Sequence, residues 1–218
     1  MIESISDAVQ LAVLAVCFAL SLVRALRERG TAWTAMVCFY ACMMLGNAYW
    51  LGYQLVFGDT PQYSYIADLS WVAGYVFLVM FAAELDRGRG VSALIPATWV
   101  PVAVCAACCV FYIVDSGSIL LNIAYNGLLA AVGFFAVKGI ASSGAQPIGD
   151  DWLGRLAGNK ALHVALLAFV AAEQALWLSS CLLEAVSVGG LEPYVVLNYV
   201  LTLSYAAILA CAWRPGKA

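Results

Sequence analysis

One carboxyl group stands in the middle of an apolar segment. Glu173 lies near the centre of the stretch 161–186, which is otherwise rich in Ala, Val and Leu. Insertion scales put the cost of a charged side chain at the centre of a membrane helix at about 2.5–3.5 kcal/mol, so we expect Glu173 to face a bundle interior and to have a partner. Such a group either binds a ligand, an ion or a proton, or hydrogen-bonds across helices as a neutral acid. The depth of Glu173 in the membrane does not by itself distinguish these two roles.

Other polar and aromatic side chains recur at helical spacing. Two triplets, Asn47/Trp50/Gln54 and Asp68/Trp71/Tyr75, share the spacing i, i+3, i+7, which places each triplet on one helix face. Interhelical hydrogen bonding is the alternative explanation. If the side chains converge, they form an outward-facing polar and aromatic pocket. The predicted ligand-binding residues are Asp68, Glu173, Asn47, Trp50, Trp71, Tyr75, Gln174, Trp177, Asn198 and Tyr205.

Composition determines which elements carry these residues. The chain has 218 residues, of which 65% are hydrophobic and 11% charged, whereas a soluble domain has roughly 25% charged residues. Crossing a bilayer takes about 20 apolar residues as a helix, because every backbone amide must be bonded within its own segment. We therefore predict an all-α, single-domain membrane protein in contact with the lipid bilayer over residues 1–218, with helices at about 7–26, 33–57, 65–83, 91–114, 119–137, 161–186 and 193–213.

The basic residues predict the orientation of the chain. All ten follow the first, third, fifth or seventh apolar stretch, and none lies in the turns after the second, fourth and sixth. Because Lys and Arg near helix ends resist translocation, this side is expected to be cytoplasmic. The N-terminus is then outside and the C-terminus inside, in the cytoplasmic membrane of a bacterium. The recurrent spacing further suggests a parallel repeat of three plus one plus three helices.

Several activities lack their residues in this sequence. The last stretch contains no Lys for a retinal Schiff base, and His163 is the only histidine, which argues against zinc hydrolases and bis-histidine haem proteins. We expect His163 to be solvated at the inner interface, and the eight cysteines to act as small apolar side chains. No catalytic constellation or phosphate-binding loop is visible, so we predict no enzyme, metal or cofactor, and the net charge of −3 gives no reason to expect nucleic acid.

The segment from Leu45 to Tyr75 resembles a known class of sensory region. It combines Asn47 and Trp50, the turn Gly58-Asp59-Thr60-Pro61, and Ala67-Asp68 followed by Trp71 and Gly74-Tyr75. This arrangement is similar to the polytopic membrane region that precedes many bacterial diguanylate cyclases and some histidine kinases. The resemblance implies that Asp68, Trp71 and Tyr75 belong to a sensing module. Position 47 is Asn where the motif has Asp, and no output domain follows residue 213, so a sensor of this kind would signal through a separate cytoplasmic partner.

Three functions remain after these considerations. The first is a sensor that binds an unknown small molecule from the outer side and is read by a partner at residues 139–160, the longest inner connection. The second is a small-solute transporter with the three-plus-one-plus-three architecture. The third is an assembly subunit of a membrane complex. The polar groups concentrate in the outer halves of the helices, which favours binding without passage.

Overall fold

The chain folds into a bundle of long helices. A computed structural model describes residues 2–58, 65–87, 95–116, 118–142, 152–182 and 192–213. Within these ranges seven helices are long and apolar enough to cross a membrane, which confirms the predicted all-α fold class and makes the chain a multi-pass membrane protein. The elements are α1 (Ile2–Glu28), α2 (Thr31–Phe57), α3 (Tyr65–Arg87), the short 3₁₀ turn η1 (Pro96–Thr98), α4 (Trp99–Ser116), α5 (Ile119–Ala141), the short α6 (Trp152–Ala157), α7 (Lys160–Leu182) and α8 (Pro193–Trp213).

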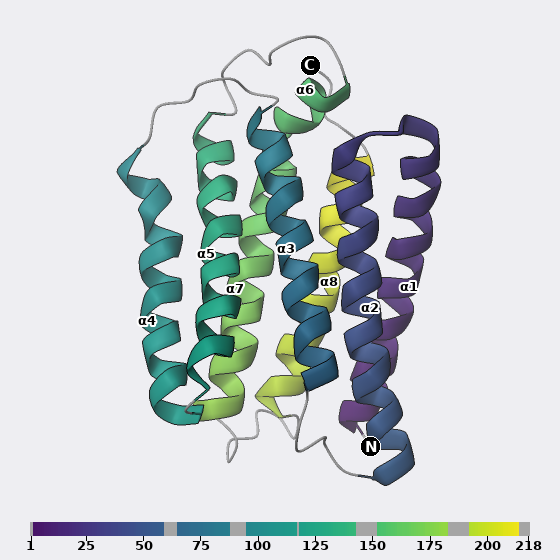
Figure 1. The fold of residues 1–218 in the computed structure, drawn as a ribbon, viewed down its shortest axis with the longest axis vertical. Helices are drawn as coiled ribbons and strands as arrows, with labels where there is room; N and C mark the ends of the chain where they lie inside the picture. The colour runs from purple at the N-terminus through teal and green to yellow at the C-terminus, as the bar shows by residue number, and fades with distance from the viewer. Residues whose placement is uncertain are drawn as a thin grey trace.

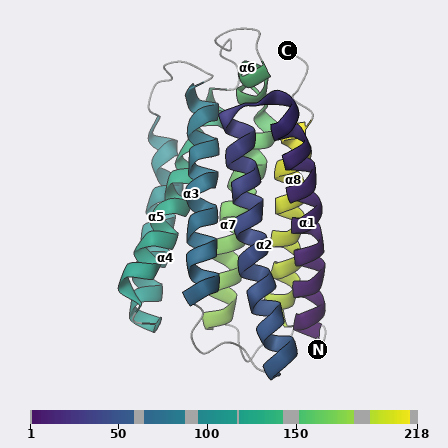
Figure 2. The same cartoon turned by 45° about the vertical axis from the view of Figure 1, so that its right-hand side comes forward.

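Six of the long helices form a closed ring. In order, α1 packs on α2, α2 on α3, α3 on α5, α5 on α7, α7 on α8, and α8 on α1. The remaining long helix, α4, lies outside this ring against α5 (Figures 1 and 2). The contacts among α1, α2 and α3 have the same order as those among α5, α7 and α8. A duplication of three helices, with α4 as the inverting helix between the two copies, would produce this correspondence. The duplication itself stays a prediction.

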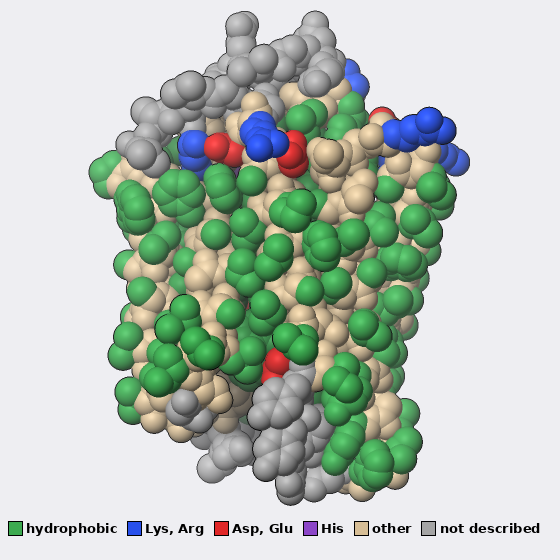
Figure 3. Space-filling view, viewed as in Figure 1, with side chains coloured by type: hydrophobic (Ala, Val, Ile, Leu, Met, Phe, Trp, Pro, Cys, Tyr) green, Lys and Arg blue, Asp and Glu red, His purple; other side chains and the backbone are tan. Residues whose placement is uncertain are grey.

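The outer surface of the bundle is suited to lipid. Large apolar side chains such as Leu55, Val114, Leu120 and Leu203 are between 69% and 85% exposed. Hydrophobic side chains cover the middle of the face seen in Figure 3. Since lipid tails give such side chains an apolar environment, their exposure is expected for a membrane protein.

The described basic residues gather at one end of the bundle. They lie where α1 meets α2, at the ends of α3 and α5, in α6 and at the start of α7, and Figure 3 shows blue side chains at the upper end. Lys138 on α5 donates to Asp86 on α3 across 2.7 Å, which ties two helices together there. We call this end the basic end. Arg89, Arg214 and Lys217 lie outside the described residues.

The helix boundaries differ from the prediction in several places. α1 begins at Ile2 rather than at residue 7, and α3 and α5 each continue four residues beyond the predicted end. Neither Pro96 nor Pro101 interrupts the body of α4. Pro96 opens the 3₁₀ turn η1 and Pro101 lies in the first turn of α4, where a missing backbone N–H costs no internal hydrogen bond.

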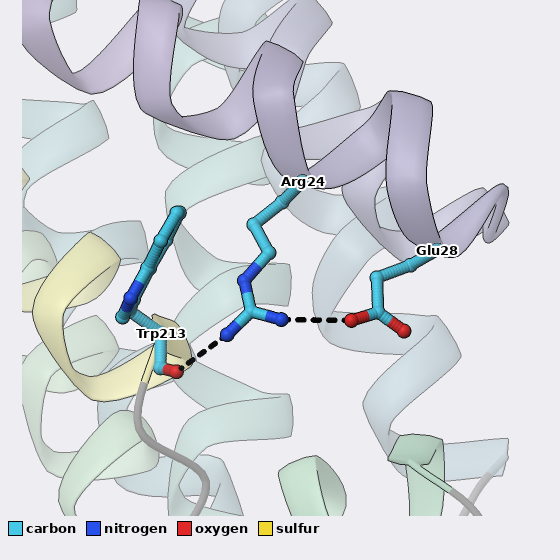
Figure 4. A network of polar contacts seen from close by, with 3 residues as sticks. All are labelled: Arg24, Glu28 and Trp213. Carbon is cyan, nitrogen blue, oxygen red and sulfur yellow. Dashed lines mark hydrogen bonds and ion pairs between the residues drawn. The ribbon is translucent and has the colours of Figure 1, made fainter.

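An Arg and Trp cluster joins the first and the last long helix at the basic end. The Arg24 guanidinium donates to the Trp213 carbonyl at 3.2 Å and to Glu28 at 2.7 Å, and it stacks on the Trp213 ring with 4.4 Å to the centroid (Figure 4). Trp33 contacts Trp213 and also Trp152 of α6, with ring centroids 6.4 and 5.6 Å apart. α6 is therefore packed against the bundle by Trp152.

His163 is buried, and the expectation that it is solvated was wrong. Its side chain is 1% exposed, and its Nε2 lies 2.9 Å from the carbonyl oxygen of Ala157 at the end of α6. The imidazole packs over Gly139 of α5, where a Cβ atom would collide with the ring. The physical reason is that Ala157 of α6 and Gly139 of α5 enclose the imidazole at the beginning of α7.

Candidate functional site

A cavity of about 440 Å³ lies within the ring of helices, toward the end opposite the basic end. Its walls come from α1, α2, α3, α7 and α8, together with Glu192, which directly precedes α8. The volume falls in the range of about 300–1,000 Å³ that is typical of small-molecule sites. The lining residues are Glu3, Asp7, Gln10, Met43, Asn47, Trp50, Gln54, Trp71, Tyr75, Glu173, Leu176, Trp177, Ser179, Ser180, Glu192, Pro193, Tyr194, Asn198, Leu201 and Tyr205.

Glu173 forms the deepest acidic contact of the cavity. It lies thirteen residues along α7 from Lys160, which is about 20 Å at 1.5 Å per residue. Its side chain is 3% exposed, and the Tyr205 hydroxyl donates to its Oε1 at 3.3 Å. Tyr75 and Trp177 also lie close enough to hydrogen-bond to this carboxyl group. Donors from α3, α7 and α8 thus surround Glu173, which still borders the cavity.

Asp7 is the centre of a second polar cluster on the α1 side. Asn198 of α8 donates through Nδ2 to Asp7 Oδ1 at 2.9 Å and to Ser6 Oγ at 3.2 Å. With the Gln54 amide in the orientation that satisfies both neighbours, its nitrogen donates to Asp7 Oδ2 at 3.3 Å and its oxygen accepts from Trp50 Nε1 at 3.1 Å. This cluster therefore joins α1, α2 and α8. Asn198 precedes Tyr205 by seven residues, so the two acidic contacts are offset by about 10 Å along α8.

Aromatic rings form much of the remaining wall. The Trp50 and Trp71 rings are 5.9 Å apart and belong to α2 and α3. This close packing requires a residue without a side chain at position 46, because a Cβ atom on Gly46 would lie 2.5 Å from the Trp71 Nε1. On the opposite side, Tyr125 of α5 contacts both Tyr75 and Trp177, at 5.6 and 6.1 Å. The rings are thus fixed by their neighbours.

A layer of buried rings lies between the cavity and the basic end. Phe39 of α2 and Phe169 of α7 meet edge to face at 5.9 Å across the inside of the helix ring, and both contact Tyr205. Tyr75 completes the layer through its contact with Phe169 at 6.0 Å. All four side chains are at most 2% exposed. We call these four residues the aromatic floor.

The structure places most of the sequence-predicted residues together. Eight of the ten line the cavity, where they come from four helices and face a common space: Asn47, Trp50, Trp71, Tyr75, Glu173, Trp177, Asn198 and Tyr205. The shared helical faces account for this convergence, because Asn47 and Trp50, Trp71 and Tyr75, Glu173 and Trp177, and Asn198 and Tyr205 each project from one side of their helix.

Asp68 and Gln174 are not brought to the cavity. The Tyr125 hydroxyl of α5 donates to the carbonyl oxygen and to Oδ1 of Asp68, at 3.2 and 3.3 Å. Gln174 donates through Nε2 to Asn126 Oδ1 at 2.9 Å, also on α5. Both side chains point toward the neighbouring helix rather than inward, and they serve as interhelical contacts.

Several lining residues escaped the sequence analysis. Glu3, Asp7 and Gln10 have the spacing i, i+4, i+7 and share one face of α1. The pattern was present in the sequence, but a predicted helix start at residue 7 excluded Glu3 and left Asp7 as a terminal residue. Glu192, which directly precedes α8, and Tyr194, in its first turn, carry no comparable signal.

Compared with known proteins, the chain matches no family model, no curated protein and no solved structure.

Proposed function

We propose that this protein is a sensory receptor of a bacterial cytoplasmic membrane, which binds a small molecule from the outer side and signals through a separate cytoplasmic protein. The observation that carries the proposal is the cavity of about 440 Å³ with Glu173 and Asp7 in its wall. Carboxyl groups at membrane depth are costly, and they are typical of functional sites. A bundle selected for packing alone would place apolar side chains there.

The predicted orientation of the chain supports access from outside. The cavity includes Glu3, Gln54 and Glu192, which lie at the ends of their helices away from the basic end. If the basic end is cytoplasmic, these residues lie at the outer surface. Labelling of single cysteines introduced at Ile5 and Arg27 in intact cells tests this arrangement. We expect reaction of an impermeant maleimide at position 5 only, after the native thiols have been controlled for, and the reverse pattern would contradict the proposed orientation.

The aromatic floor supports binding without passage. Phe39 and Phe169 interlock where a transport pathway would continue toward the basic end. A carrier also needs polar groups along the inner half of its route, whereas the interior at this level is formed by rings. The resemblance of the segment from Leu45 to Tyr75 to sensory membrane regions favours the same reading.

The same helices connect the cavity to the basic end. α8 carries Asn198 and Tyr205 in the cavity wall and Trp213 in the Arg24 cluster, while α2 carries Asn47 near one end and Trp33 near the other. A ligand that shifts α8 would therefore move Trp213 against Arg24 and α6. This is the proposed route to a partner at residues 139–160, of which 143–151 lie outside the described residues.

Transport is the second candidate, and the ring of six helices favours it. The neighbour order around the ring is the one that a three-plus-one-plus-three carrier would have. Uptake of a stabilising compound into proteoliposomes distinguishes the two functions. A receptor releases no compound into the vesicle interior, and accumulation above the protein-free control would establish the carrier instead.

The receptor proposal itself is tested by thermal stability of the purified chain in detergent against a compound library of mixed charge. We expect at least one compound to raise the unfolding temperature of the wild type and to have no effect on Ser180→Trp, which fills the cavity from its rim. Val164→Trp is the matched control, since Val164 lies on the same helix and faces lipid with 48% of its surface exposed. If no compound stabilises the wild type, or if Ser180→Trp responds equally, the receptor proposal is wrong.

A further inference from the structure

The cavity wall is acidic and aromatic, and its described lining contains no basic side chain. Four carboxyl groups border the space: Glu3, Asp7, Glu173 and Glu192. The described Lys and Arg residues lie at the basic end, and Asn47 in the wall is sixteen residues along α2 from Thr31, or about 24 Å. Among the described residues, no Lys or Arg side chain is therefore positioned to neutralise these groups. A bound molecule of positive charge would do so.

The carboxyl groups are spread along the cavity, which suits an organic cation rather than a single metal ion. Glu3 and Glu192 lie within hydrogen-bonding reach of one another near the rim, where two carboxylates favour a proton or a cation between them. Glu173 lies deeper, and Tyr194 in the cavity wall interacts electrostatically with Asp7, Glu3 and Glu173. Within the described residues, no three acidic, His or Cys side chains converge as a metal site requires.

The rings supply the other half of the recognition chemistry. Six aromatic side chains face the cavity: Trp50, Trp71, Tyr75, Trp177, Tyr194 and Tyr205. The face of an indole or phenol ring carries negative electrostatic potential and attracts a cation, most strongly when both are shielded from water. An ammonium group substituted with carbon combines a positive charge with an apolar surface, so it satisfies carboxylates and ring faces together. A neutral or anionic ligand supplies no positive charge to the four carboxyl groups.

From this geometry we infer that the cavity binds a small organic cation of the ammonium class. The inference rests on the proposed receptor function, because it names the chemistry of the ligand that the same cavity would take. Glu173 and Asp7 are then the charge partners of the cation, and the Trp50 and Trp71 pair forms an aromatic wall beside it. The charge of the ligand, not its size, is then the main determinant of affinity.

The test is a tryptophan-fluorescence titration of the purified full chain with compounds matched in shape. The cationic probes are tetramethylammonium, choline and putrescine, and the neutral control is 3,3-dimethyl-1-butanol, which has the shape of choline without its charge. We expect saturable quenching by at least one cation, and binding of the neutral alcohol at least ten times weaker than that of choline. Glu173→Gln and Asp7→Asn should each weaken binding of the cation about tenfold, a change of about 1.4 kcal/mol.

Glu84→Gln is the matched control, because Glu84 lies near the basic end of α3 and pairs with Arg87 at 2.8 Å. This variant should bind the cation as the wild type does. Glu173→Gln keeps an acceptor for the Tyr205 hydroxyl, and its melting temperature without ligand shows whether it folds. The cation inference is overturned if none of the three cations binds, if the neutral alcohol binds as well as choline, or if both cavity variants behave like Glu84→Gln. In these cases a neutral or anionic library compound that still stabilises the wild type, but not Ser180→Trp, would leave the receptor proposal standing. Failure of every compound would remove both.

Discussion

The contact between Gly46 and Trp71 offers a direct test of how the cavity wall is built. A Cβ atom at position 46 would lie 2.5 Å from Trp71 Nε1 and 2.7 Å from its Cδ1, and ordinary contact begins at 3.4 Å. In Gly46→Ala the indole must therefore move by about 0.9 Å, the difference between 3.4 and 2.5 Å. Gly52 lies on the same helix, and a Cβ there meets nothing within 4 Å. The two substitutions differ only in what the new methyl group touches.

The expected difference in stability between Gly46→Ala and Gly52→Ala depends only on the effects that the two variants do not share. Each replacement removes a flexible residue from the interior of α2, which stabilises the helix by about 0.5–1 kcal/mol. Only Gly46→Ala also overpacks its neighbour, which generally costs about 1–3 kcal/mol. Trp71 borders the cavity and can turn into it, so we expect the lower part of that range. The unfolding temperature of Gly46→Ala should thus fall below that of Gly52→Ala by about 2–4 °C for each kcal/mol of difference.

Two measurements check this prediction. Thermal unfolding in detergent compares the stabilities, and the tryptophan emission spectrum reports whether the environment of Trp71 has changed. The displaced indole reduces the free volume of the cavity, so Gly46→Ala should also weaken any ligand that Gly52→Ala still binds. Equal melting temperatures and equal spectra for the two variants would show that Trp71 does not rest on Gly46, and the described wall geometry would be incorrect.

Three further predictions concern the rest of the bundle. Arg24→Ala should lower stability by about 1–2 kcal/mol in a thermal unfolding assay, because it removes the stacking on Trp213 and the contact with the C-terminal carbonyl of α8. Arg27→Ala, at an exposed position, is the control. Similar losses of stability for both variants would contradict a specific role for the cluster. A double-mutant cycle of Lys138→Ala and Asp86→Ala should give a coupling energy of up to about 1 kcal/mol for their 2.7 Å pair, and a coupling of zero would show that the pair does not hold α3 to α5. Gln174→Leu should lower stability by about 0.6 kcal/mol for each of the interhelical hydrogen bonds that its side chain makes with Asn126, Tyr112 and Cys105. The variant should leave ligand affinity unchanged, so a loss of affinity would place Gln174 in the site after all.

Part of the candidate site could be predicted because helical periodicity is a local property. The spacing of Asn47 and Trp50, and of Asn198 and Tyr205, determines that each pair shares a helix face wherever the helix packs. The depth of Glu173 requires that its helix turn that face inward. Eight of the predicted residues line one cavity, and predicting them did not require knowing which helices are neighbours.

Asp68 and Gln174 show where this reasoning fails. Each lies close in sequence to a cavity residue, and periodicity alone gives no reason to separate them from the others. Their side chains turn to Tyr125 and Asn126 because α5 packs beside both α3 and α7. A polar residue on the flank of a helix faces either the interior or a neighbour, and only the packing of the neighbour decides which.

The sequence by itself determined a multi-pass helical protein with its basic residues collected at one end, because hydropathy, helix length and charge act on each segment independently of the others. Tertiary structure decided which helices close the ring, that His163 is buried between α5 and α6, and that Glu3 and Asp7 join Glu173 around one cavity. These features depend on contacts between residues far apart in the chain, such as Asp7 with Asn198 and Arg24 with Trp213. No local pattern encodes such a pairing, since each partner is compatible with many others until the helices have packed.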